Sequence, residues 1–109
     1  METLATKRCK PCEGGVAPYN EQQARSMLAQ LKGWALQEGK LAKTYPFANY
    51  HHTMAFVNAL AWISHREDHH PDLEVGYNKC RVTYWTHAVG GLSENDFICA
   101  AKCDALFEL

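Results

Sequence analysis

The stretch LEVGYNKCRVTYWTH, residues 73–87, predicts a β-hairpin around which the rest of the fold can be arranged. Leu73 to Tyr77 forms one strand, Asn78-Lys79 makes a tight turn, and Cys80 to His87 forms the returning strand. Alternate side chains of the returning strand share a face, and the more apolar set is the expected core face. That set is Cys80, Val82, Tyr84 and Thr86. His87 then lies at the far end of the opposite, mostly polar face.

A helix and a second hairpin precede this stretch. Residues 20–33 have apolar side chains at helical spacing, with Asn20 and Gln23 placed as a capping box and Gly33 as the stop. Residues 34–46 alternate in polarity on both sides of a Glu-Gly turn, which is typical of a hairpin.

Two further helices flank the first hairpin. Residues 49–68 form the longest helical pattern, with Asn49 as its cap, and Pro71 prevents the helix from continuing. Residues 93–107 form the last helix, where Ser93 and Asp96 have the spacing of a capping box.

The element order is therefore helix, strand, strand, helix, strand, strand, helix. This order predicts an α+β fold of two layers, α-β-β-α-β-β-α, with a four-stranded antiparallel sheet and three helices on one face. One face and two edges of such a sheet stay uncovered, so we expect the chain to form dimers or larger assemblies.

Composition narrows the class of protein. The 109 residues are 47% hydrophobic, which suits one globular domain, and the net charge of −1 gives no basic surface for nucleic acid. No apolar run is long enough to span a membrane, and residues 1–12 lack the apolar core of a secretory signal, so we expect a cytoplasmic protein. Residues 1–18 end in CEGGVAP and are predicted to be a flexible leader before a domain at 19–109.

The chain has five cysteines, an odd number that favours reduced thiols over a disulfide framework. Cys9 and Cys12 form a C-x-x-C in the leader, where we expect two exposed thiols. A structural zinc would need a second pair of ligands. Cys99 and Cys103, four residues apart, could supply that pair, but zinc is the less favoured interpretation. No metal is expected.

The stretch EDHHPD, residues 67–72, places His69 and His70 at the exit of the long helix. A hairpin can return His87 to this pair, and three imidazoles in a cleft suit general acid–base chemistry near neutral pH. Two alternatives remain open: a polar surface turn, and a metal site that uses His65 and His69, four residues apart. The motif HREDH does not match a zinc protease motif. The remaining histidines, at 51 and 52, are expected on the surface.

Residues 68–97, DHHPDLEVGYNKCRVTYWTHAVGGLSENDF, resemble the pterin-4a-carbinolamine dehydratases. The shared elements are H-H-P, five residues, Y-N-K, then T-H and G-L-S-x-x-D, without a change of spacing. The resemblance covers about residues 20–107 and leaves the C-x-x-C leader outside.

The resemblance implies an enzyme, a 4a-hydroxytetrahydrobiopterin dehydratase, which is a carbon–oxygen hydro-lyase without metal or organic cofactor. It would convert 4a-hydroxytetrahydropterin to quinonoid dihydropterin, recycling the pterin cofactor of aromatic amino acid hydroxylases, and would be a homodimer or tetramer. Of the catalytic set, His69 and His87 would transfer protons and His70 would mainly hold the substrate. The implied substrate-binding residues are Asp68, His69, His70, Pro71, Trp85, Thr86, His87 and Ala88.

The chain departs from the family pattern at one position. His65 stands where family members carry Glu, so another acid would have to orient a catalytic histidine, and Glu67 is a candidate. Asp96 matches an acidic family position, but its first expected role is the helix cap. The alternative function is a non-catalytic dimeric module that docks on a hydroxylase or a transcription regulator, as some vertebrate members do. The C-x-x-C leader favours a bacterial-type metabolic enzyme.

Overall fold

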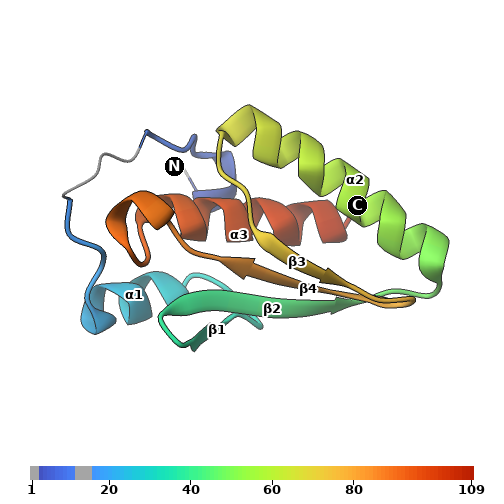
Figure 1. Cartoon of the computed structure of the whole chain (residues 1–109), viewed down its shortest axis with the longest axis horizontal. Helices are drawn as coiled ribbons and strands as arrows, with labels where there is room; N and C mark the ends of the chain where they lie inside the picture. Colours follow the sequence, from blue (N-terminus) through green and yellow to red (C-terminus); the bar gives the residue numbers. More distant parts are fainter. Residues whose placement is uncertain (1–2, 12–15) are drawn as a thin grey trace.

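The computed structural model describes residues 3–11 and 16–109 and shows helices packed over one antiparallel sheet (Figure 1). The helices are α1 Glu21–Leu28, α2 Tyr50–Glu67 and α3 Glu94–Phe107, with 3₁₀ turns at η1 Leu4–Thr6 and η2 His87–Val89. The strands are β1 Ala35–Gln37, β2 Lys40–Pro46, β3 Asp72–Val75 and β4 Lys79–Tyr84. The predicted α+β fold is confirmed. None of the described helices combines the length and the apolar character of a membrane span.

The sheet has the strand order β1-β2-β4-β3, and all its neighbours are antiparallel. Each hairpin forms one half of the sheet, and the central pair β2–β4 joins them across the connection made by α2. In this pair Tyr45 lies opposite Cys80, and Leu41 lies opposite Tyr84. Residues opposite each other share a face, so these side chains point together into the helix layer.

The core lies between this face of the sheet and the helices. The predicted core face of β4 is confirmed, because Cys80, Val82 and Tyr84 are fully buried. The helices contribute apolar side chains to the same cluster, among them Ala24, Phe56, Leu60, Phe97, Ile98 and Ala100. Full burial of a large apolar side chain is worth about 1.5–3 kcal/mol, so this layer supplies the main stabilisation.

The helix caps follow the sequence prediction closely, whereas one helix end does not. The Asn20 and Gln23 capping box is present at the start of α1, and the Asn49 side chain accepts from His52 N–H at the start of α2. The predicted end of α1 at residue 33 is wrong, since the helix ends at Leu28. Residues 29–31 continue in tighter turns, where Leu31 N–H donates to the Leu28 carbonyl.

The end of α2 determines where the two adjacent histidines go. Asp68 adopts a left-handed conformation, with φ of 52°, and the His69 N–H donates to the Ser64 carbonyl. This is the usual closure of a helix C-terminus, and it turns the chain sharply away from the helix axis. The predicted helix end near Asp68 is confirmed, and His69 and His70 leave α2 toward the β4–α3 connection.

That connection differs from the prediction, because β4 ends at Tyr84 and does not continue to His87. Thr86 N–H donates to the Gly91 carbonyl and Gly91 N–H to the Thr86 carbonyl, so residues 87–90 form a short closed loop. Gly90 closes this loop with a φ of +70°. A side chain at Gly91 would collide with Pro18, because its Cβ would lie 2.8 Å from the Pro18 Cβ. His87 therefore starts a turn instead of ending a strand. β3 likewise spans residues 72–75 instead of 73–77.

Residues 3–11, which we call the N-terminal segment, pack against the helices rather than extending from them. The N-terminal segment lies beside α3, against which η1 packs (Figure 1). Leu4 is buried, and Lys102 Nζ donates to the Ala5 carbonyl. The expectation of an exposed thiol is thus wrong at Cys9, which is half-buried. Cys12 lies outside the described residues.

Candidate active site

Side chains from four parts of the chain surround a cavity of about 470 Å³, within the usual size range of small-molecule sites. They come from the exit of α2, the β4–η2 connection, the first turn of α3 and the N-terminal segment. We call it the histidine cavity. Its lining is Cys9, Lys10, Pro11, Arg66, Glu67, Asp68, His69, His70, Trp85, Thr86, His87, Ala88 and Asn95. The three histidines that the sequence singled out all line it, and of the predicted substrate-binding residues only Pro71 does not.

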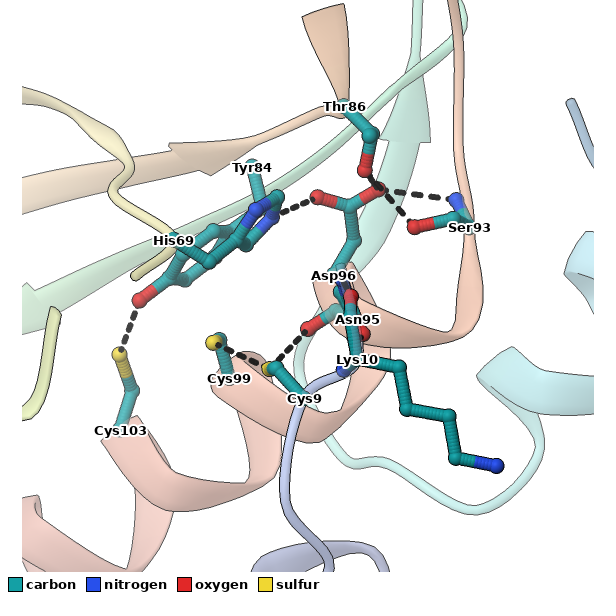
Figure 2. A network of polar contacts seen from close by, with 10 residues as sticks. All are labelled: Cys9, Lys10, His69, Tyr84, Thr86, Ser93, Asn95, Asp96, Cys99 and Cys103. Atoms are coloured by element: carbon teal, nitrogen blue, oxygen red, sulfur yellow. Dashed lines mark hydrogen bonds and ion pairs between the residues drawn. The ribbon is translucent and has the colours of Figure 1, made fainter. Parts of the chain in front are cut away.

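His69 is held by a buried carboxylate. Its Nε2 lies 2.6 Å from Oδ1 of Asp96, and its ring stacks on Tyr84 with a centroid distance of 5.8 Å and an interplanar angle of 8° (Figure 2). The His69 side chain is 11% exposed and that of Asp96 is fully buried. With Asp96 ionised, Nε2–H is the donor, and Nδ1 is then the acceptor nitrogen of the neutral ring.

Asp96 has two roles at once. Its Oδ2 accepts from Ser93 N–H at 3.0 Å, which is the predicted helix cap, and from Thr86 Oγ1 at 2.8 Å (Figure 2). The carboxylate is therefore fixed by the start of α3 and by Thr86, the residue that precedes η2 and His87. Such outer contacts fix the orientation of a functional imidazole. The cap was predictable from local spacing, but the contact with His69 joins residues 27 positions apart and was not.

His70 and His87 lie at the outer part of the cavity, and both are exposed. The His87 ring contacts the Trp85 ring at a tilted angle of 37° with a centroid distance of 3.7 Å, and the His70 and His87 centroids are 6.4 Å apart. Trp85 Nε1–H is buried and has no acceptor among the described residues. A buried donor of this kind is normally paired, so it is a candidate to bind an acceptor atom of a ligand.

Glu67 does not contact His69, although the sequence made it a candidate for orienting a histidine. Its Oε1 accepts from Cys9 N–H at 2.8 Å, and its Oε2 lies 2.9 Å from Arg8 Nε. Burial raises the pKa of Glu67, but the Cys9 bond and the charges of Lys102 and Arg8 outweigh it, so this pKa lies below its usual value. The orienting acid for His69 is Asp96.

The N-terminal segment forms one wall of the cavity, which the sequence did not indicate. Lys10 N–H donates to Asn95 Oδ1 at 3.0 Å, and Asn95 Nδ2 donates to the Lys10 carbonyl at 2.6 Å (Figure 2). The Glu67 contact fixes the same segment to α2, so it bridges the two helix ends that carry His69 and Asp96. These contacts span 58 and 85 residues, and no local pattern signals them.

The other histidines lie elsewhere. His65 is exposed and contacts the Trp62 ring at a tilted angle with a centroid distance of 5.5 Å, and it does not line the histidine cavity. His51 and His52 are exposed on the first turn of α2, about 25 Å from its exit at 1.5 Å per residue. Over residues 3–11 and 16–109, no group of three or more His, Cys, Asp or Glu side chains is placed to hold a metal.

A comparison with known families identifies the family of the chain. The sequence model described as pterin 4 alpha carbinolamine dehydratase matches residues 17–106, which is most of the chain. The chain belongs to this family. The family model begins after the N-terminal segment.

Curated relatives cover almost the whole chain. A protein of Nitrosospira multiformis is 60% identical over 109 residues, covering 100% of this chain and 96% of its own length. One of Nitrosomonas europaea is 62% identical over 106 residues, covering 96% of this chain and 94% of its own. Both are named "Putative pterin-4-alpha-carbinolamine dehydratase".

Two solved structures share the fold. A transcriptional coactivator/pterin dehydratase from Brucella melitensis has a TM-score of 0.79 at 26% identity, covering 82% of this chain and 97% of its own. A pterin dehydratase-like protein described as a RuBisCO assembly factor in the alpha-carboxysome has a TM-score of 0.60 at 31% identity, covering 69% and 89%. The family fold thus occurs in proteins whose descriptions include enzymatic and assembly roles.

Proposed function

We propose that the protein dehydrates 4a-hydroxytetrahydropterins to quinonoid dihydropterins, with His69 and His87 as the proton-transfer residues. The observation that carries this proposal is the gathering of His69, His70 and His87 on one cavity, with His69 fixed by the buried Asp96. Membership of the pterin carbinolamine dehydratase family supports the choice of substrate.

The reaction needs one acid and one base. The 4a-hydroxyl leaves as water after it is protonated, and the N5 proton must be removed, so the elements of one water molecule are lost overall. Imidazoles can perform either step near neutral pH. Because Asp96 engages Nε2 of His69, Nδ1 carries the lone pair of the neutral ring, and we assign His69 as the base. His87 is then the acid.

The remaining cavity residues would hold the pterin. A pterin ring carries carbonyl and ring-nitrogen acceptors, which the buried Trp85 Nε1–H could bind. The exposed ring of His70, near that of His87, would contact the substrate without a required proton transfer. The reaction would serve the recycling of the pterin cofactor of an aromatic amino acid hydroxylase.

The test is a turnover assay with carbinolamine generated by a hydroxylase. We expect wild type to accelerate dehydration, and His69→Ala and His87→Ala each to lower kcat/KM by about 100-fold, within the usual range for acid–base groups. His65→Ala is the matched control, since this exposed histidine lies outside the cavity, and its rate should equal that of wild type. Wild-type rates in both cavity variants would refute the catalytic assignment.

We also propose a homodimer or tetramer. The edge strand β3 pairs only with β4 among the described strands, and its Leu73 and Val75 are exposed although they lie opposite core residues of β4. An open edge with exposed apolar side chains favours pairing with another chain. Sedimentation of the purified protein measures the assembly, and a monomer at micromolar concentration would contradict it.

A second candidate function is a binding module that docks on a hydroxylase or a regulator. This second function is supported by the descriptions of the two similar structures, one a coactivator and one an assembly factor. It predicts no measurable turnover and a partner interaction that His69→Ala and His87→Ala leave unchanged. Turnover that depends on these histidines would favour the enzyme.

A further inference from the structure

Two thiols that are 90 positions apart in the sequence meet beside the histidine cavity. The Sγ atoms of Cys9 and Cys99 are 3.5 Å apart (Figure 2). Cys9 belongs to the N-terminal segment and lines the cavity, whereas Cys99 is fully buried on α3. Neither thiol takes part in the proposed dehydration, and the family match begins only at residue 17.

The position of Cys9 is fixed by bonds on both of its sides. Its own N–H donates to Glu67 Oε1 at 2.8 Å, and the next residue, Lys10, exchanges two hydrogen bonds with the Asn95 side chain. The Cys9 thiol also lies 3.7 Å from the Asn95 carbonyl oxygen. The backbone thus holds the two sulfurs together before any bond forms between them, and the effective concentration of each thiol near the other is high.

We propose that Cys9 and Cys99 are a reversible oxidation site, which low-molecular-weight disulfides convert to a disulfide that fastens the N-terminal segment to α3. A disulfide bond is about 2.05 Å long, so the sulfurs need to approach by about 1.5 Å. The half-exposed Cys9 side chain can supply that movement. All four described cysteines are free thiols, so the structure shows the reduced form.

The reaction proceeds by two thiol–disulfide exchanges. The Cys9 thiolate attacks one sulfur of the small disulfide RSSR, forms a mixed disulfide and releases RS⁻, which takes up the proton that Cys9 lost. The Cys99 thiol then loses its proton to solvent, and its thiolate attacks the Cys9 sulfur and releases a second RS⁻. The two cysteines are oxidised by two electrons, and RSSR is reduced to two RSH.

The surroundings determine the order of attack. Cys9 is reached from the cavity, whereas Cys99 is closed to external reagents. Its hydrogen bond with Cys9 and its burial raise the pKa of Cys99 well above the usual range. External oxidants therefore react first at Cys9, and Cys99 reacts only with a sulfur already bonded at position 9. The nearby Cys103 is buried against Tyr84 Oη, and burial raises its pKa to about 12.

The expected consequence of oxidation is that the N-terminal segment can no longer move away from α3. In the reduced protein, residues 3–11 are held by hydrogen bonds and ion pairs, which local fluctuations can break. In the oxidised protein the covalent bond keeps Cys9 on α3. Amide exchange at Cys9 and Lys10, whose N–H groups bond to Glu67 and Asn95, should then slow by about 10-fold or more.

The test treats the full chain with oxidised glutathione, maps its disulfides by mass spectrometry, and compares amide exchange before and after. We expect a Cys9–Cys99 link as the main product, its reversal by dithiothreitol, and the slower exchange at residues 9 and 10. Cys12→Ser is the matched control and should form the link as wild type does. Cys99→Ala should stop at glutathione bound to Cys9, and Cys9→Ser should form no link to Cys99.

Three results would overturn the proposal. The first is a Cys9–Cys12 disulfide as the main product in wild type. The second is a fully reduced protein under conditions that oxidise a model dithiol. The third is a Cys9–Cys99 link that leaves amide exchange of the N-terminal segment unchanged. None of these measurements depends on dehydratase turnover, so failure here leaves the proposed function untouched.

Discussion

Two of the carboxylates on helix α3, Asp96 and Asp104, lie eight residues apart, and each collects several hydrogen bonds, yet their surroundings differ. Asp104 accepts from Trp34 Nε1 at 3.1 Å, from Lys43 Nζ at 2.8 Å and from Tyr45 Oη at 2.5 Å. Asp96 accepts from the Ser93 backbone and Thr86 and lies 2.6 Å from His69. Both carboxylates tie the helix to the chain segments beneath it.

The difference lies in what the bonded groups can do. The donors on Asp104 include no imidazole, and burial together with the Asp104 bond raises the pKa of Tyr45 far above its usual value. That cluster cross-links α3 to β2 and the start of β1. Asp96 instead holds an imidazole that lines a cavity, and imidazole is the side chain best suited to proton transfer near neutral pH. A buried carboxylate thus indicates a functional site where its partner is titratable and faces a cavity.

Between the two carboxylates, the larger expected effect on activity comes from Asp96→Asn. The amide keeps the size of the side chain but cannot accept at both of its terminal atoms, so His69 loses its fixed orientation. We expect kcat/KM to fall about 100-fold, equivalent to about 2.7 kcal/mol. Steady-state kinetics measures this fall, at a temperature where circular dichroism shows that the variant is folded. A fall of less than about threefold would show that Asp96 acts as a cap alone.

The same substitution at the other carboxylate should change stability instead of activity. Asp104→Asn leaves the Lys43 ammonium without its counter-charge and weakens the Tyr45 bond in a cluster where the Asp104 side chain is 23% exposed. We expect the free energy of unfolding to fall by about 1–2 kcal/mol and kcat/KM to stay within about twofold. Urea denaturation provides the first number. A kcat/KM loss equal to that of Asp96→Asn would break the distinction between the two clusters.

A smaller effect is expected at the orphan donor of the cavity. Trp85→Phe keeps an aromatic surface for His87 but removes Nε1–H, which we assign to substrate binding. We expect KM to rise about fivefold, equivalent to about 1 kcal/mol, with kcat little changed. If kcat falls while KM is unchanged, Trp85 positions His87 instead of binding the pterin.

The smallest effect concerns Glu67, a further carboxylate, which lines the cavity but does not contact a histidine. Because its pKa is lowered in the folded chain, its contribution to stability is present above its unfolded pKa, near 4.5, and is lost as pH falls through the folded pKa. Glu67→Gln should therefore reduce the free energy of unfolding by up to about 1 kcal/mol at pH 7 and by less at pH 3. Urea titrations at both pH values measure it, and a larger loss at pH 3 would contradict the sign.

The elements that the sequence predicts well are those whose signals are local. The caps at Asn20, Asn49 and Ser93 satisfy helix N–H groups within three residues, and Pro71 prevents helix from continuing beyond the close of α2 at Asp68. The Glu38-Gly39 turn also follows from the local pattern, since Gln37 pairs with Lys40. The predicted Asn78-Lys79 turn is wrong, because Lys79 already belongs to β4 and Val75, not Tyr77, pairs with Cys80. The gathering of the histidines was an inference from hairpin length together with family resemblance.

The features that the sequence missed depend on contacts between distant segments. β4 ends at Tyr84 because Thr86 pairs with Gly91, and α1 ends early as its chain tightens into turns. The second role of Asp96 and the packing of residues 3–11 arise from contacts that span 27 to 97 positions. Composition made residues 1–18 look like a linker, but composition does not report which backbone groups find partners in the folded chain.

The most direct test of the central claim is the dehydration rate of the double variant His69→Ala/His87→Ala in the same carbinolamine assay. If these two imidazoles carry the proton transfers, the double variant should remain folded and accelerate the reaction no more than buffer does. A rate within about threefold of wild type would contradict the account, because it would show that the histidine cavity is not where the chemistry occurs.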